Sequence, residues 1–208
     1  MMENNDTQQL IKSIPEELSI VPLNDAVVYP YMLIPMMVTD ENLIRVVDEA
    51  LASNKIVGVF TQKNKDVSNP GPDDIYHTGC AVLIQKMARF PDGHIRIIGH
   101  GLARIKIVEF TSAGPFMRAR IKILTEKVKI NDRVKAIVRN VKGVFSRIFD
   151  VSDSYPEELK GMVLSIDDPA RLADFLATHL NIEIPEKQKV LEILDPVKRL
   201  TVVYEYIN

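Results

Sequence analysis

The side chains of this chain that could carry out chemistry are few and scattered. A zinc site needs histidine or cysteine ligands at short, regular spacings, and the 4 histidines and single cysteine lack them. His94 and His100 could approach each other near a hairpin and hold an adventitious ion, but surface or turn positions are the simpler interpretation. The other two histidines are His77 and His179. The spacing therefore predicts no metal centre.

Acid–base and nucleophilic chemistry are no better supported. Asp167 and Asp168 are adjacent carboxylates, but Asp168 directly precedes Pro169. Because this is the pattern of a helix start, we expect Asp168 to cap backbone N–H groups. Gly99-His100-Gly101 is the densest glycine cluster, and it predicts a tight turn between two strands. The sequence contains neither a Walker-type phosphate loop nor a G-x-S-x-G motif, so we expect no catalytic site and no cofactor in this chain.

Charge and apolar content narrow the class of protein. The 208 residues carry a net charge of −2, and residues 1–124 and 125–208 each hold 13 basic against 14 acidic side chains. Without a basic region there is no electrostatic footprint for nucleic acid, so we expect none as a partner. Cys80 lies in an apolar run, which predicts a buried side chain. A single cysteine without a disulfide partner in the chain fits a reducing compartment. The longest apolar run, Ala26–Val38, is too short to span a bilayer and is interrupted by prolines. We expect no membrane contact and a cytoplasmic location.

The elements that would position these side chains begin with a β-rich part. Residues 1–18 are polar and are expected to be flexible. Alternating apolar residues and flanking turn signals predict strands at 19–23, 32–38, 56–61, 78–87, 94–99, 102–110 and 116–124. Pro91-Asp92-Gly93 predicts a hairpin turn between two of them. One helix is predicted to begin after Thr39 or Asp40, either of which can cap it. A long polar loop is expected between Gln62 and Asp74.

From Thr125 onward the apolar residues recur at the helical period. The predicted helices run from 132 to 150, from a Ser154–Glu157 capping box to about 164, from Asp168 onward, from Pro185 onward and from Asp195-Pro196 onward. Residues 19–124 and 125–208 are therefore expected to form a β-rich part and a helical part. The last amphipathic pattern reaches Asn208 without a stop signal, so we expect a truncated helix and a natural chain that continues.

The segment most typical of a binding surface is Val27–Val38. Its two prolines predict an edge strand or an irregular extended path. Methionine and tyrosine give adaptable apolar surface that suits many different apolar segments. The candidate substrate-binding residues are Tyr29, Tyr31, Met32, Leu33, Met36 and Met37. The alternative is that most of these side chains fill the β core. Glu41 and Arg45 stand one helical turn apart, either as a solvated ion pair or as a weaker candidate for contact with a partner.

The order of these motifs along the chain resembles the N-terminal substrate-recognition domain of the Lon proteases. The segments that carry the resemblance are 20–30 (IVPLNDAVVYP), 32–35 (MLIP), 91–93 (PDG), 101–104 (GLAR), 165–174 (SIDDPARLAD) and 188–192 (QKVLE). Together they cover nearly the whole chain from Ser19, and the segment 165–174 is the nearest match. The likeness implies an α+β fold: a β-rich pseudo-barrel with one packed helix, followed by an all-α helical bundle.

The resemblance also implies a role. The module would recognise unfolded or tagged polypeptides and support hexamer assembly in a cytosolic quality-control protease of the stress response. ATP, Mg²⁺ and the serine–lysine peptidase would belong to domains absent from this chain, so no catalytic residue is carried over. Two alternatives stay open. The chain could be a stand-alone adaptor or ligand-binding protein of the same family, or a nucleic-acid binder with a related barrel, which the even charge balance disfavours.

Overall fold

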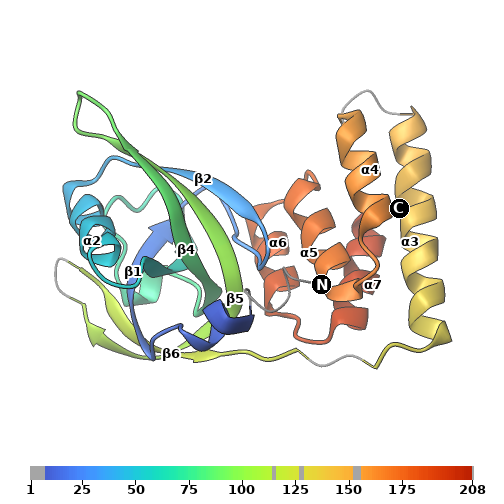
Figure 1. Cartoon of the computed structure of the whole chain (residues 1–208), viewed down its shortest axis with the longest axis horizontal. Helices are drawn as coiled ribbons and strands as arrows, with labels where there is room; N and C mark the ends of the chain where they lie inside the picture. The colour runs from blue at the N-terminus through green and yellow to red at the C-terminus, as the bar shows by residue number, and fades with distance from the viewer. Residues whose placement is uncertain (1–7, 114–115, 127–128, 152–155, 208) are drawn as a thin grey trace. The chain divides into compact units, whose positions relative to one another are not determined.

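The computed structural model of the chain describes residues 8–113, 116–126, 129–151 and 156–207, and the side chains of all of them except 149–151. The chain divides into two units, Met1–Leu124 and Thr125–Asn208, and each is described by itself. The described part of the first unit contains a helical stretch at residues 8–12, a six-stranded sheet and the helix α2 (Glu41–Leu51), as Figure 1 shows.

The sheet of the first unit closes on itself. Its strands are β1 (Glu17–Leu23), β2 (Leu33–Val38), β3 (Ile56–Thr61), β4 (Thr78–Arg89), β5 (Ile95–Ser112) and β6 (Arg118–Ile123). The strand order is β2-β5-β4-β3-β1-β6, and β6 pairs with β5 as well. The strands β5, β4, β3, β1 and β6 therefore form a ring, and β2 is added outside it against β5. The predicted α+β fold with a pseudo-barrel is confirmed.

The strand β5 corrects one prediction. Gly99-His100-Gly101 is not a turn, because β5 runs without a break through all three residues. A Cβ on Gly99 would lie 2.5 Å from Cγ1 of Val82, and one on Gly101 would lie 2.2 Å from the carbonyl oxygen of Tyr29. The glycines are thus needed where other parts of the chain approach β5 closely. A close approach of this kind explains glycine inside a strand as well as a turn would explain it between strands.

The long strand β5 serves two neighbours in succession. Its residues Ile95–His100 pair with β2, and its residues Ile105–Ser112 pair with β6. The predicted hairpin between β4 and β5 is confirmed: Gly93 has a φ of 88° and donates to the carbonyl of Phe90. In Figure 1 this hairpin extends beyond the other strands.

The helix α2 packs on β1 and β3. Asp40, one of the two predicted caps, accepts hydrogen bonds from the backbone N–H groups of Asn42 and Leu43 at 2.8 and 3.0 Å. These N–H groups have no partner within the helix, which is why a carboxylate at this position favours the helix start. The buried side of α2 carries Val46, Val47 and Ala50.

The loop after β3 has more structure than the sequence predicts. Gln62 forms an isolated antiparallel bridge with Ile75, and a short 3₁₀ turn, η1 (Pro72–Asp74), ends the loop. The backbone N–H of Gln62 donates to the carbonyl of Leu23 at 2.7 Å, which extends the pairing of β3 with β1. The two ends of the loop are therefore held together on the sheet.

The second unit is built from α3 (Asp132–Val151), α4 (Glu157–Ser165), α5 (Pro169–His179), α6 (Ile184–Glu192) and α7 (Pro196–Ile207). Asp168 caps α5 as predicted, accepting from the backbone N–H of Arg171 at 2.8 Å. Asp195 caps α7 in the same way. The predicted capping box of α4 depends on Ser154, which lies outside the described residues. Asp167 takes a different role from Asp168 and forms an ion pair with Lys142 at 2.8 Å.

A buried ion pair joins α5 to α7. The guanidinium of Arg199 is fully buried and donates to Asp174 at 2.7 Å, to Glu126 at 2.6 Å and to the carbonyl of Ile193 at 2.9 Å. Three acceptors satisfy the fork of donors that arginine presents, so the charge is tolerated inside the unit.

Among the described residues, every helix is too short or too polar to cross a bilayer.

Candidate polypeptide-binding surface

The strand β2 forms one edge of the sheet and presents two different faces. Met36 and Val38 are buried, whereas the alternate residues Leu33, Pro35 and Met37 are exposed. Leu33 and Met37 are 64% and 63% exposed, which is unusual for two large apolar residues on the same face of one strand. Pro35 lies between them, and a residue without an N–H donor fits an edge strand. The apolar segment is thus divided between core and surface.

The predicted binding residues divide in the same way. Tyr29 and Met36 are 0% and 4% exposed and belong to the core, so burial removes both from the candidate surface. Tyr31 is exposed and has a φ of 65°, a conformation that only a few non-glycine residues adopt. Its backbone N–H donates to the carbonyl of Gly101 at 2.7 Å, which holds the chain as it enters β2. Met32 is half-buried, and its binding role stays a prediction.

Sequence reasoning missed one member of this surface. Ile98 on β5 is directly opposite Pro35 and is also exposed, so the two side chains share the outer face. We call Leu33, Pro35, Met37 and Ile98 the outer β2 surface. Once the register of β2 on β5 is known, the contribution of Ile98 follows, but the sequence alone does not show which strands are neighbours.

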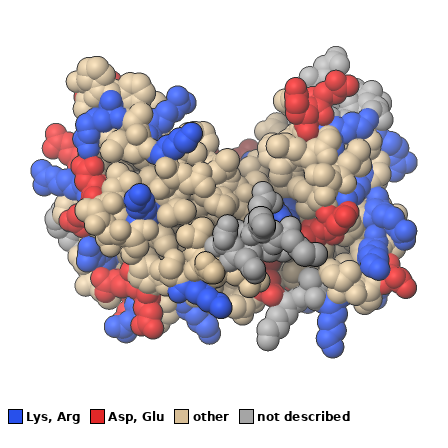
Figure 2. Space-filling model, viewed as in Figure 1, with Lys and Arg blue, Asp and Glu red and all other residues tan. Residues whose placement is uncertain are grey.

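Basic side chains flank the outer β2 surface. Arg96 is opposite Met37, and Lys86 on β4 is opposite Ile98 on β5; both are exposed. Elsewhere the charges are mixed, and on the face shown in Figure 2 basic and acidic side chains are interspersed. A rim of polar groups around an apolar centre is the usual arrangement of a surface that binds protein.

Two hollows lie where β1, the start of α2 and the loop after β3 meet, and one of them extends to β2. One has a volume of about 490 Å³ and is lined in part by Ile34–Val38, and the other has a volume of about 480 Å³. They share the lining residues Pro22, Asp40, Leu43, Gln62 and Ser68, and we call this shared region the Gln62 groove. Volumes of this size are typical of ligand pockets.

Gln62 is the most unusual residue of this groove. It is 8% exposed, and its Oε1 atom is buried without a hydrogen-bond partner among the described residues. A buried acceptor left without a donor costs about 1–3 kcal/mol, so such groups are rare in native proteins. The sequence signal was weak, because glutamine at the start of a polar loop predicts an exposed side chain.

Glu41 and Arg45 both lie on the exposed side of α2. Among the described residues no ion pair or hydrogen bond joins their side chains, so the predicted solvated ion pair is wrong. Isolated helical pairs of this type are stabilised by only about 0.2–0.5 kcal/mol, which is too little to hold two long side chains in one geometry. Their proposed contact with a partner stays a prediction.

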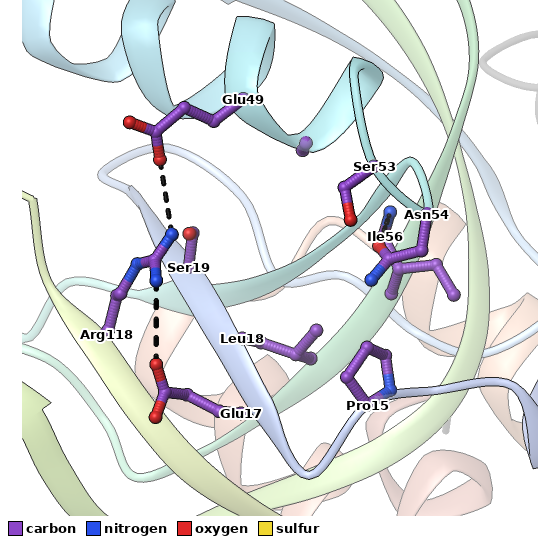
Figure 3. A pocket seen from close by; sticks show the side chains of 10 residues that line it. Pro15, Glu17, Leu18, Ser19, Glu49, Ser53, Asn54, Ile56 and Arg118 are labelled. Atoms are coloured by element: carbon purple, nitrogen blue, oxygen red, sulfur yellow. Dashed lines mark hydrogen bonds and ion pairs between the residues drawn. The ribbon is translucent and has the colours of Figure 1, made fainter.

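A third, smaller pocket of about 190 Å³ lies between β1, α2 and β6 (Figure 3). Arg118 of β6 points between two carboxylates, 3.2 Å from Glu49 of α2 and 3.7 Å from Glu17 of β1. Because both acidic groups already face an arginine, this cluster is satisfied within the protein. We interpret it as a tie between the helix and the sheet.

The described residues contain no grouping of three or more histidine, cysteine or acidic side chains that could hold a metal ion. His77 packs edge-on against Phe110, and His179 stacks against Phe175. His94 lies 3.3 Å from Asp92 in the hairpin turn. Cys80 is buried, as predicted.

Comparison with known proteins assigns the chain to a family. The family described as the ATP-dependent protease La (LON) substrate-binding domain matches residues 17–208. The chain is 40% identical over 207 residues to the Lon protease of Dictyoglomus thermophilum, covering 100% of this chain and 26% of that protein. It is 36% identical over 195 residues to the Lon protease of Trichlorobacter lovleyi, covering 93% of this chain and 24% of that protein. The chain thus spans about a quarter of the length of these relatives.

Solved structures share the fold. The N-terminal domain of the Mycobacterium avium complex Lon protease matches with a TM-score of 0.75 and 19% identity, covering 92% of this chain and 97% of that one. A Lon N-terminal domain protein from Xanthomonas campestris matches with a TM-score of 0.63 and 15% identity, covering 89% of this chain and 95% of that one. From its sequence, over nearly its whole length, the chain belongs to the family of Lon protease substrate-binding domains.

Proposed function

We propose that this domain recognises unfolded polypeptide segments through the outer β2 surface. The observation that carries the proposal is the pair of large apolar side chains, Leu33 and Met37, that an edge strand holds exposed on one face. A flexible methionine on the same strand face as an aliphatic side chain can adapt to segments of different shape. The family description as a substrate-binding domain supports the same role.

In a full-length protein of this family, the domain would deliver bound segments to an ATPase and a serine–lysine peptidase. ATP and Mg²⁺ would bind in those other domains, and the substrates would be unfolded or tagged proteins in the cytoplasm. We also propose that the full-length protein is a hexamer whose contacts come mainly from those domains. Sedimentation of the present 208-residue chain would then give a monomer or a weak dimer. A stable hexamer of this chain alone would contradict that proposal.

The recognition role can be tested by fluorescence anisotropy. The probe is a fluorescein-labelled peptide of alternating leucine, phenylalanine, serine and lysine. We expect Leu33→Asp and Met37→Asp each to weaken binding about tenfold or more, since each places a charge where an apolar side chain must be buried. Val108→Asp is the matched control, because Val108 is exposed on β5 outside the outer β2 surface. Equal affinity of all four proteins for the probe, or no binding by the wild type, would contradict the proposal.

A further inference from the structure

The Gln62 groove and the outer β2 surface are continuous. Pro35 and Met37, which form part of the outer β2 surface, also line the hollow of about 490 Å³ that contains Gln62. A segment bound on β2 can therefore continue into the groove without leaving the protein. The inference below deepens the proposed function and rests on it.

The groove offers both apolar walls and one unused acceptor. Pro22 and Leu43 are shared by both hollows and supply apolar surface, whereas the buried Oε1 of Gln62 has no donor in the part of the chain that the structure describes. The terminal torsion of glutamine is broad and roughly two-fold, so the amide can turn over when a ligand binds, and the buried Oε1 then faces the groove. A ligand that fits must therefore carry a hydrogen-bond donor next to an apolar group.

The charges at the groove favour a neutral or basic ligand. Asp40 lies in the groove and Asp25 lines the adjoining hollow of about 490 Å³, where Lys65 is the only basic side chain among the described residues. Two carboxylates disfavour phosphate or a nucleotide, and this agrees with the lack of a basic region in the sequence. An extended polypeptide meets all of these requirements, because its backbone offers an N–H group beside every side chain.

We propose that an extended polypeptide segment lies in the Gln62 groove and donates one backbone N–H to Oε1 of Gln62. An apolar side chain of the same segment packs against Pro22 and Leu43. The outer β2 surface would then select segments by apolar content, while Gln62 reads the backbone, which is independent of sequence. Such a division suits a domain that has to accept many different unfolded chains.

The test removes the donor and the acceptor separately. A series of the fluorescein-labelled peptide is made in which one backbone amide at a time is N-methylated. Each peptide is titrated against the wild-type chain and against Gln62→Met, which keeps the shape of the side chain but not its oxygen. Gln85→Met is the matched control, because Gln85 is exposed on β4 and lies outside the groove. Thermal unfolding of each variant is measured in parallel.

We expect Gln62→Met to weaken binding of the parent peptide about three- to tenfold, the range for one net hydrogen bond, while Gln85→Met has no effect. N-methylation at one position of the peptide should weaken its binding to the wild type by the same factor. The same N-methylation should not weaken binding to Gln62→Met any further. The melting temperature of Gln62→Met should be unchanged or higher, because an unsatisfied buried oxygen is removed.

The failure of this inference can be told apart from that of the proposed function. If Leu33→Asp and Met37→Asp weaken binding but Gln62→Met does not, the outer β2 surface stands and the Gln62 contact is refuted. If each N-methylation weakens binding by the same factor in both proteins, Gln62 is satisfied by water rather than by the peptide, and the inference is overturned. If the wild type does not bind the parent peptide, both proposals fall.

Discussion

Gly101 lies directly against the backbone of Tyr29: a Cβ on Gly101 would be 2.2 Å from the carbonyl oxygen of Tyr29. This contact brings the entry to β2 onto the middle of β5. Two hydrogen bonds lie beside it, from Tyr31 N–H to the carbonyl of Gly101 and from Gly101 N–H to the carbonyl of Met32. The conformation of the segment that precedes the outer β2 surface therefore depends on a residue distant in sequence.

Gly101→Ala should lower the free energy of unfolding by about 3 kcal/mol, since the new methyl group meets backbone that cannot move aside without breaking this pairing. Urea denaturation followed by circular dichroism measures the change. The matched control is Gly143→Ala in α3, where a Cβ meets no other atom within 4 Å. There we expect a gain of about 0.5–1 kcal/mol, because alanine favours a helix interior over glycine. A Gly101→Ala protein as stable as the wild type would refute the packing argument.

Met36 and Met37 are neighbours in sequence with opposite environments, at 4% and 63% exposure. Met36→Ala should reduce the free energy of unfolding by about 2–5 kcal/mol, because it opens a cavity in the core. Met37→Ala should change it by less than about 0.5 kcal/mol. Denaturation curves of the two variants make the comparison. Similar losses in both would mean that β2 does not present the faces described here.

The buried pair of Arg199 and Asp174 should be sensitive to the loss of either partner. Asp174→Ala leaves the buried guanidinium with Glu126 and a carbonyl only, and we expect a loss of about 3–5 kcal/mol in unfolding free energy. The exposed pair of Lys189 and Glu186 provides the control, and Lys189→Ala should cost less than about 1 kcal/mol. Equal effects in chemical denaturation would contradict the importance of burial.

Asp167 links stability to pH. The hydrogen bond and charge of Lys142 hold the pKa of Asp167 below its ordinary value of 3.8. The unfolded chain therefore binds this proton more tightly, so the contribution of the pair is complete above pH 3.8 and is lost as the pH falls through the lower, folded pKa. Asp167→Asn should lower the melting temperature at neutral pH, and the difference from the wild type should shrink in acid. In a Lys142→Met background this pH-dependent difference should disappear; its persistence there would assign the effect to another group.

Local signals in the sequence predicted much of the secondary structure. Asp40 and Asp168 were identified as helix caps, and Pro91-Asp92-Gly93 as a hairpin turn, because each depends on hydrogen bonds and backbone angles within a few residues. The ion pair predicted between Glu41 and Arg45 was wrong, although the spacing permits it. Exposed pairs are weak, and spacing alone does not decide whether they form.

The sequence by itself determined the fold class, the family and the segment that is richest in adaptable apolar side chains. Only the tertiary structure decided which of those side chains remain accessible, because burial depends on the strand that pairs with β2 and on the side from which α2 packs. It also decided that Gly99 and Gly101 lie inside β5, since the atoms that require glycine there belong to β4 and to the segment before β2. The Oε1 atom of Gln62 lacks a partner among the described residues for the same reason: its surroundings come from parts of the chain that are brought together only by folding.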